Sequence, residues 1–227
     1  MSTLVAVGDS FTYGDELHDR ETQAYPYLLQ KQYNFNELIN LGLPGGSSDY
    51  VFRTVIELLI SGTKPDLIII SWPEQNRFEG LINHPKFEST DDAPHIKPTN
   101  FMIGRKTITS EPNWVQGYYR ESYDIAWAFR KQYNQIIALQ GFLKNVKQRY
   151  LMCNVNGLRG YYDRYEVFLK NHFASIDPAF FVGWPREGFV EWTKGCIKGK
   201  FGHPLVDGHQ IIAEKFNEHI RNIGWFS

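Results

Sequence analysis

A run of Leu and Ile that ends in a serine, Leu67–Ser71, is the feature that most constrains how this chain can fold. A strand whose successive residues are nearly all apolar is buried on both faces, which is typical of parallel sheets. Further strands are predicted at Leu4–Val7, Glu37–Leu41 and Tyr150–Val155, with a short apolar piece at 180–182. We therefore expect a parallel sheet built around these runs.

Helical stretches separate the predicted strands. Their ranges are 24–32, 49–60, 124–148, 162–173 and 208–223. Alternation of strands and helices favours an α/β fold, in which a parallel sheet lies between two layers of helices.

Three polar turns directly follow three of the predicted strands. Ser10 comes after the first strand, the Gly45 turn after the second, and the segment Trp72–Asn76 after the third. The carboxyl ends of parallel strands meet at one edge of the sheet, and ligands of open α/β folds bind there. A functional site is therefore expected at this edge.

A long stretch of irregular composition interrupts the alternation at about 80–122. It contains four prolines among Asp, Asn, Thr and Gly residues, which indicates a loop. The interpretation is a single domain spanning 1–227 with a loop insertion, and such loops are often lids or binding elements. Trp114, Tyr118 and Tyr119 near its end would either form a platform for a sugar ring or pack the insertion onto the domain.

Charge and composition argue against several classes of function. The chain has 24 basic and 25 acidic residues, a net charge of −1, and no basic block of the kind that binds nucleic acid. Its apolar runs reach only strand length, which argues against a membrane span, and its first residues lack the features of a secretory signal. A cytoplasmic location is expected, and release by lysis, as for a phage component, would look the same.

The two cysteines, Cys153 and Cys196, are too few for a disulfide framework and are expected to be reduced core residues. No HExxH motif, paired acidic spacing or histidine cluster indicates a metal site. The glycine-rich turn at 42–46 lacks the Gly-Lys-Ser/Thr ending of a phosphate loop. No cofactor is therefore expected.

The segment Gly8–Gly14 contains the first motif with specific chemistry. It places Ser10 on a turn after a strand, where a plain helix cap is the alternative interpretation. The sequence Gly-Asp-Ser-Phe-Thr-Tyr-Gly resembles the first block of the SGNH (GDSL) hydrolase family, G-D-S-x-T-x-G, at every fixed position. The resemblance implies that Ser10 is the nucleophile, that its N–H belongs to the oxyanion hole, and that Asp9 supports the turn.

The turn after the second predicted strand resembles the second block of the family. Asn40–Gly45 fits the pattern N-x-x-x-x-G, whose glycine donates a backbone N–H to the oxyanion. The resemblance implies this role for Gly45, with Gly46 as a rival. A plain turn before a capped helix is the alternative for a Pro-Gly-Gly sequence.

The third block departs from the family pattern G-x-N-D, whose Asn side chain is the third oxyanion donor. The strand here continues into Trp-Pro-Glu-Gln-Asn-Arg, so that Gln75 and Asn76 compete for the role and Asn76 is favoured. Arg77 would either bind an anionic group of the substrate or pair with Glu74 or Glu79.

The segment Phe201–Glu214 resembles the last block of the family, D-x-x-H-P followed by an apolar helix. The resemblance implies that His203 is the base, which takes the Ser10 proton and later protonates the leaving alcohol. A loop histidine fixed by Pro204 is the alternative. His209 aligns with a second histidine or aromatic residue of the family and is expected to be structural.

The acid that normally orients this histidine is missing from its usual place, because Lys200 stands three residues before His203. Loss of the acid that orients the histidine lowers kcat by about 10⁴-fold when no other group replaces it. Three possibilities stay open: a backbone carbonyl holds the ring, a distant carboxylate folds in, or the site has decayed. Asp207 is a candidate acid, although its place before the last helix favours an N-cap.

The resemblance covers essentially the whole chain and implies a three-layer α/β/α sandwich, flavodoxin-like, with about five parallel strands. It also implies hydrolysis of a carboxylic ester, on a small molecule or a glycan, through an acyl-serine intermediate. A carbohydrate O-acetyl ester is the first substrate hypothesis. The alternatives are a non-catalytic SGNH-like module for binding or assembly and a transferase that uses the same acyl-enzyme.

Overall fold

The computed structural model describes residues 2–81, 98–102, 113–157 and 162–226. Its main sheet has four parallel strands in the order β2-β1-β3-β6. These strands are β1 (Thr3–Gly8), β2 (Glu37–Gly42), β3 (Leu67–Trp72) and β6 (Tyr150–Asn154). All four carboxyl ends therefore lie at the same edge, as expected from the sequence.

Strand β3 is the inner strand that its composition predicts. All six of its residues are buried, and it pairs with β1 on one side and β6 on the other. Fully burying a Leu or Ile side chain contributes about 1.5–3 kcal/mol to folding, so this strand is a large source of stability. It continues directly into the segment that carries Asn76 and Arg77.

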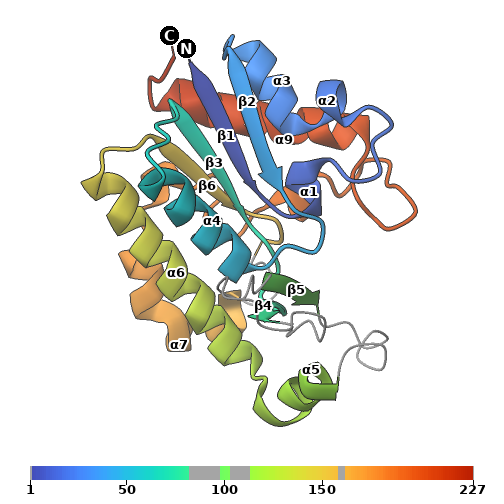
Figure 1. Cartoon of the computed structure of the whole chain (residues 1–227), viewed down its shortest axis with the longest axis vertical. Helices are drawn as coiled ribbons and strands as arrows, with labels where there is room; N and C mark the ends of the chain where they lie inside the picture. Colours follow the sequence, from blue (N-terminus) through green and yellow to red (C-terminus); the bar gives the residue numbers. More distant parts are fainter. Residues whose placement is uncertain (1, 82–97, 103–112, 158–161, 227) are drawn as a thin grey trace, which may run out of the picture.

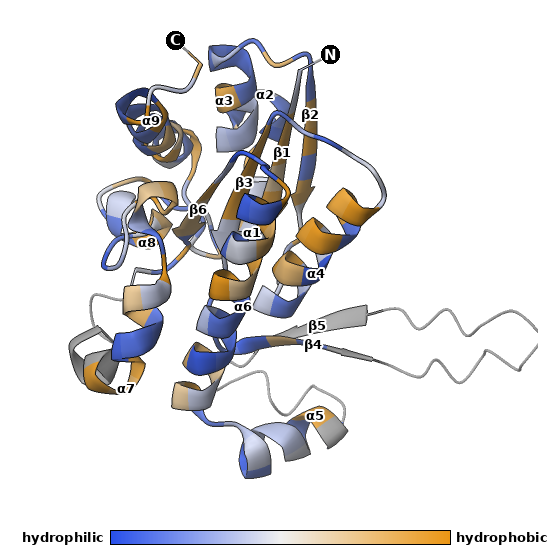
Figure 2. Ribbon diagram, turned by 90° about the vertical axis from the view of Figure 1, so that its left-hand side faces the viewer, coloured by the Kyte–Doolittle hydropathy of each residue, from blue (hydrophilic) through white to orange (hydrophobic). Residues whose placement is uncertain are grey.

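Helices cover both faces of the sheet, which confirms the three-layer α/β/α sandwich (Figure 1). One face is covered by α4 (Ser48–Ile60) and α6 (Ile125–Asn145), with α7 (Tyr162–Ser175) packed beside α6. The other is covered by α3 (Tyr25–Gln32), α8 (Phe189–Trp192) and α9 (Val206–Asn222). The strands are largely apolar (Figure 2), and their buried residues form one core cluster with buried residues of α4 and α6.

Short elements complete the described chain. They are α1 (Ser10–Tyr13), α2 (Arg20–Gln23), α5 (Asn113–Gly117), a π-helical turn (Tyr118–Ser122) and a 3₁₀ turn (Pro178–Phe180). Side-chain caps fix the starts of the two long helices that face the site. Ser47 Oγ accepts from the Tyr50 amide at 3.2 Å, and Asp124 Oδ1 accepts from the Trp127 amide at 2.7 Å.

The described parts of the expected insertion are more regular than a loop. Strand β4 (Arg77–Leu81) pairs antiparallel with β5 (Pro98–Met102), and helical turns occupy 113–122. The hairpin reaches beyond the main sheet (Figure 2). The remainder of the predicted loop, residues 82–97 and 103–112, lies outside the described residues.

The structure differs from two further predictions, which concern the segment 180–182 and the two cysteines. The apolar piece near 180–182 contributes a parallel bridge between Met152 and Phe181 instead of a full fifth strand. Of the two cysteines expected in the core, Cys153 is buried, whereas Cys196 is partly exposed.

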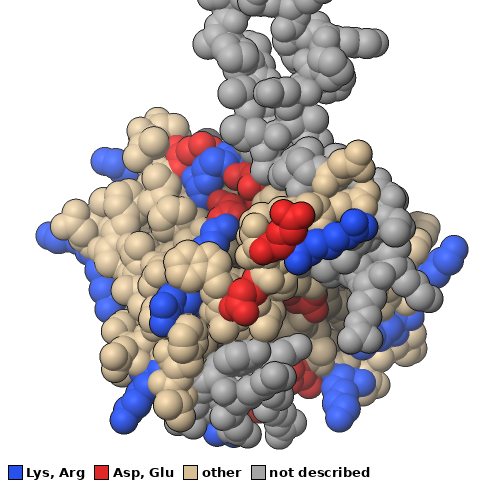
Figure 3. Space-filling view, turned by 90° about the horizontal axis from the view of Figure 1, so that it is seen from below, with Lys and Arg blue, Asp and Glu red and all other residues tan. Residues whose placement is uncertain are grey.

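On the face seen from below, acidic side chains gather near the middle, while most of the basic ones lie towards the rim (Figure 3). Among the residues described, no helix combines the length and the apolar character needed to cross a membrane.

Candidate active site

Ser10 lies at the start of α1, immediately after β1. Asp9 caps this turn, because its Oδ1 accepts a hydrogen bond from the Phe11 amide at 3.1 Å. A Cβ on Gly8 would lie 2.1 Å from Thr12 Oγ1, so only glycine lets the turn fold back this closely. Gly14, with φ of 84°, ends the turn in the left-handed region.

The structure brings Ser10 and His203 together, as the resemblance implies. The Nε2 atom of His203 lies 2.9 Å from Ser10 Oγ, although 193 positions separate the two residues. The Ser10 residue is only 4% exposed, and the His203 ring packs edge-on against Phe11. This distance is short enough for the serine hydroxyl to donate to the imidazole.

A carboxylate that the sequence motifs did not indicate completes the chain of hydrogen bonds. Glu16 Oε2 lies 2.8 Å from His203 Nδ1. The two carboxylate oxygens also accept from the amides of Phe201 at 2.9 Å and His203 at 3.2 Å. An Nδ1–H donated to Glu16 leaves the Nε2 lone pair facing Ser10, which is the tautomer that a general base needs.

Glu16 is held in the ionised form by its surroundings. Partial burial raises the pKa of Glu16, but hydrogen bonds from the Phe201 amide, the His203 ring and the His203 amide outweigh burial and leave the pKa below its ordinary value. Of the three possibilities left open by Lys200, the geometry is that of a distant carboxylate that folds in. Its position in the turn after α1 gave no spacing signal in the sequence.

The approach of Glu16 to the His203 loop depends on local backbone features. Glu16 has φ of 66°, in the left-handed region, and its amide donates to Asp15 Oδ1 at 3.2 Å. A Cβ on Gly199 would lie 2.5 Å from the Glu16 carboxylate. A side chain at position 199 would therefore displace the acid from its place beside His203.

The Gly45 turn lies beside the Ser10 turn. Asn40 Nδ2 donates to the Thr12 carbonyl at 3.0 Å and Asn40 Oδ1 accepts from the Gly42 amide at 3.0 Å, which ties the end of β2 to α1. The Gly46 amide donates to the Leu43 carbonyl at 2.7 Å and is thus occupied within the turn. Gly45 has φ of 77°, and a Cβ there would enter open space.

The two candidates for the third oxyanion donor are in different surroundings. Gln75 Nε2 donates to Gln132 Oε1 at 2.7 Å, so this amide is occupied by a side chain of α6. Asn76 lines a small cavity with Phe78 and neighbouring residues, and its backbone carbonyl accepts from the Tyr119 hydroxyl at 3.3 Å.

Arg77 reaches the turn that carries Ser10. Its Nη1 lies 2.9 Å from Asp9 Oδ2 and 3.3 Å from the Gly46 carbonyl oxygen. The Asp9 side chain is fully buried, and that of Arg77 is only 10% exposed. Burial raises the pKa of Asp9, and the Arg77 guanidinium opposes this shift.

The prediction that Arg77 pairs with Glu74 or Glu79 was wrong. Glu74 accepts a hydrogen bond from Asn156, and Glu79 is held by Arg53 through two hydrogen bonds. Both acids therefore have other partners, and the buried carboxylate of Asp9 takes their place beside Arg77.

The last helix also differs from expectation at its start. It begins at Val206, with Leu205 at the N-cap, so Asp207 lies inside the first turn and is neither an N-cap nor a partner of His203. Its Oδ2 accepts from the Ile197 amide at 3.1 Å. His209 is fully buried, and its Nδ1 accepts from the Tyr25 amide at 3.2 Å.

The aromatic side chains near the end of the insertion pack mainly on one another. Tyr119 is buried against Phe78, Tyr118 and Tyr123. This contact matches the packing interpretation for Tyr119, whereas the side chain of Trp114 lies outside the described residues. Within the described ranges, no group of three or more His, Cys, Asp or Glu residues is placed to hold a metal ion.

Ser10, His203 and Glu16 lie at the carboxyl edge of the α/β/α sandwich, and the sandwich itself is similar to solved structures of esterases and of a G-D-S-L family protein. Esterase EstA from Pseudoalteromonas sp. has a TM-score of 0.55 at 13% identity, covering 98% of each chain. A family two carbohydrate esterase from Clostridium thermocellum, solved with cellohexaose, has a TM-score of 0.55 at 14% identity, covering 99% of this chain and 65% of that one. A G-D-S-L family protein from Desulfitobacterium hafniense DCB-2 has a TM-score of 0.53 at 14% identity, covering 96% and 99%.

These likenesses establish the SGNH fold. At the level of sequence, the chain belongs to a family of unknown function, DUF6071, whose profile matches residues 12–226. Comparison with curated proteins gives no match.

Proposed function

We propose that this protein is a serine esterase that hydrolyses a carboxylic ester through an acyl intermediate on Ser10. The observation that carries the proposal is the continuous chain of hydrogen bonds from Ser10 Oγ through His203 to Glu16. A nucleophile, a base and a group that orients the base, each within hydrogen-bond reach of the next, form the arrangement required for acyl transfer.

The proposed reaction has two halves. In the first, His203 Nε2 takes the Ser10 proton as Oγ attacks the ester carbonyl, and then gives it to the departing alcohol. In the second, His203 takes a proton from water as the water attacks the acyl-serine, and then returns this proton to Ser10 Oγ as the Oγ–C bond breaks and the carboxylic acid departs. Glu16 stabilises the imidazolium that forms in each half.

We assign the oxyanion to the backbone amides of Ser10 and Gly45, with the Asn76 side chain proposed as third donor. The choice of Gly45 over Gly46 is supported by the Gly46 amide, which is occupied by the Leu43 carbonyl. Removing one such donor typically costs about 10²–10³ in rate.

A carbohydrate O-acetyl ester is the proposed substrate class. Its support is the likeness to the Clostridium carbohydrate esterase and the aromatic residues beside Arg77, where Trp127 is 56% exposed next to a cavity lined by Phe78, Tyr118 and Tyr123. Exposed aromatic faces suit the apolar faces of sugar rings. We further propose that the segment 80–122 is an insertion into one domain spanning 1–227.

The test is labelling with a fluorophosphonate probe, with the modified residue mapped by mass spectrometry. Wild type should be labelled at Ser10, and Ser10→Ala and His203→Ala should not. Ser61→Ala changes a serine at the far end of α4 and should label normally. A folded wild type that resists labelling would overturn the proposal in favour of a non-catalytic module.

Product analysis then separates hydrolysis from transfer. Acetylated xylo- and cello-oligosaccharides and a simple acetyl ester should release acetate. Acetate replaced by an acetylated acceptor when an alcohol is added would identify a transferase instead.

A further inference from the structure

We propose that Arg77 is a positioning residue that fixes the two turns of the oxyanion hole relative to each other. The inference rests on the proposed function, and it assigns to Arg77 a task that the usual third block of the family does not contain. The evidence is a single guanidinium nitrogen that binds both turns.

The two contacts of Arg77 Nη1 flank the two proposed amide donors. Asp9, which directly precedes Ser10, lies 2.9 Å away, and the carbonyl of Gly46, which directly follows Gly45, lies 3.3 Å away. A displacement of Arg77 would therefore free a neighbour of each donor at once. Backbone amides stabilise an oxyanion only while they stay aimed at the same point.

The Asp9 carboxylate transmits this constraint to Ser10. Its second oxygen accepts from the Phe11 amide at 3.1 Å, so the carboxylate is held between α1 and the guanidinium. The contact between Arg77 and Asp9 lies in surroundings where screening by water is weak, which strengthens it.

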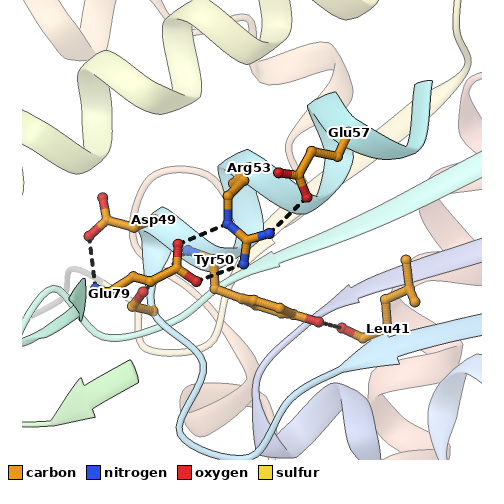
Figure 4. Close-up of polar contacts among 7 residues, drawn as sticks. Leu41, Asp49, Tyr50, Arg53, Glu57 and Glu79 are labelled. Atoms are coloured by element: carbon orange, nitrogen blue, oxygen red, sulfur yellow. Dashed lines mark hydrogen bonds and ion pairs between the residues drawn. The ribbon is translucent and has the colours of Figure 1, made fainter. Parts of the chain in front are cut away.

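Arg77 is the first residue of β4, and this strand is bound to α4 by contacts of its own. Two residues further along β4, the Glu79 carboxylate accepts two hydrogen bonds from the Arg53 guanidinium on α4, at 2.9 and 2.7 Å (Figure 4). The Glu79 amide donates to Asp49 Oδ2 at 3.1 Å. The hairpin is thereby fixed to α4 by contacts that do not touch the nucleophile turn.

This arrangement provides a matched pair of variants. Arg77→Gln removes the contact between the two turns, whereas Arg53→Gln removes an ion pair of the same hairpin outside the site. We expect Arg77→Gln to lower kcat and the rate of fluorophosphonate labelling in parallel, by about 10²-fold, with KM for a neutral acetyl ester changed less than about twofold. Arg53→Gln should lower the thermal midpoint and leave kcat within about twofold of wild type.

Two further variants keep the test decisive. Arg77→Lys should recover only part of kcat, because an ammonium group does not reproduce the planar geometry of a guanidinium. Asp9→Asn/Arg77→Gln removes both buried charges together and so avoids the unpaired carboxylate that can prevent Arg77→Gln from folding. We expect this double variant to fold and still to show the loss of kcat, since the link to Gly46 is absent.

Three results would overturn the inference: an Arg77→Gln or a double variant with wild-type kcat, a loss of kcat no larger than that of Arg53→Gln, or an effect confined to KM for anionic esters. The last would make Arg77 a substrate-binding residue. A wild-type protein without labelling or turnover would instead contradict the proposed function, so the two failures are distinguishable.

Discussion

The Glu16 carboxylate lies 2.8 Å from Nδ1 of His203 and also accepts a hydrogen bond from the His203 amide, although 187 positions separate the two residues in the sequence. One side chain thus orients the imidazole and fixes the loop that carries it. In the family pattern, a local acid three residues before the histidine would orient the ring, and here Lys200 occupies that position.

Replacing Glu16 by Gln should reduce kcat by about 10²–10⁴-fold, since the neutral amide neither fixes the tautomer of His203 nor stabilises its imidazolium. The measurement is steady-state hydrolysis of an acetyl ester. Glu21→Gln, an exposed residue of α2, is the matched control and should retain wild-type turnover. A Glu16→Gln enzyme within threefold of wild type would reduce Glu16 to a support of the loop.

Replacing Gly199 by Ala should reduce activity through Glu16. The new methyl group would meet the Glu16 carboxylate at 2.5 Å, so the acid must move away from His203. Gly195→Ala, in the same loop, adds a methyl group with no atom within 4 Å and should keep its activity. We expect Gly199→Ala to approach the rate of Glu16→Gln, and equal rates for the two alanine variants would show that the approach is not critical.

How much of this site the sequence could predict depends on how local each contact is. Ser10 and the Gly45 turn follow strands whose ends must meet at one edge, and a short block placed His203, so patterns along the chain were enough. Glu16 and the Asp9–Arg77 pair depend on how a turn and a hairpin fold over that edge. Neither the hydrophobic periodicity of the sequence nor the spacing of its motifs indicates contacts between residues so far apart in the chain. The partners expected for Arg77 were wrong for the same reason, because sequence neighbours were the only ones visible.

Replacing Gly45 by Ala should lower kcat/KM by about 10²-fold or more, since its Cβ would enter the open space where the substrate carbonyl is proposed to bind. A residue other than glycine at positive φ also costs about 1–2 kcal/mol in stability. Gly62→Ala controls for that cost, because Gly62 has φ of 91°, equally open surroundings, and a position at the far end of α4. Similar stability losses with activity lost only at position 45 are expected. Activity lost at neither position would remove Gly45 from the oxyanion hole.

The choice between Asn76 and Gln75 can be made with two alanine variants. Asn76→Ala should lower kcat by about 10²–10³-fold if its amide is the third donor. Gln75→Ala removes the donor to Oε1 of the buried Gln132, which costs about 1–3 kcal/mol of stability, and should leave kcat close to wild type. Loss of kcat in Gln75→Ala alone would reverse the assignment. Wild-type kcat in both would indicate an oxyanion hole of two backbone amides.

His209 should make the free energy of unfolding depend on pH between about 4 and 6.5. Burial, and to a smaller extent the nearby His203, lowers the pKa of His209 from 6.5 to about 4. The unfolded chain therefore takes up a proton below pH 6.5 that the folded chain refuses, and stability is lost as the pH falls through this window. Between pH 7.5 and 5 the loss amounts to about 2 kcal/mol. Urea unfolding at both pH values measures it, with His209→Gln as the comparison.

The folded carboxylates whose pKa values are lowered, Glu16, Asp177 and Asp207, respond mainly below pH 5 and stay outside this window. Burial and Arg130 also lower the pKa of His172. His172 therefore also reduces stability as the pH falls, and it does so equally in wild type and in His209→Gln. The difference between wild type and His209→Gln therefore isolates His209. An equal loss of stability in the two proteins would mean that His209 is protonated in the fold. Its Nδ1 would then have given up the hydrogen bond from the Tyr25 amide that joins α9 to α3.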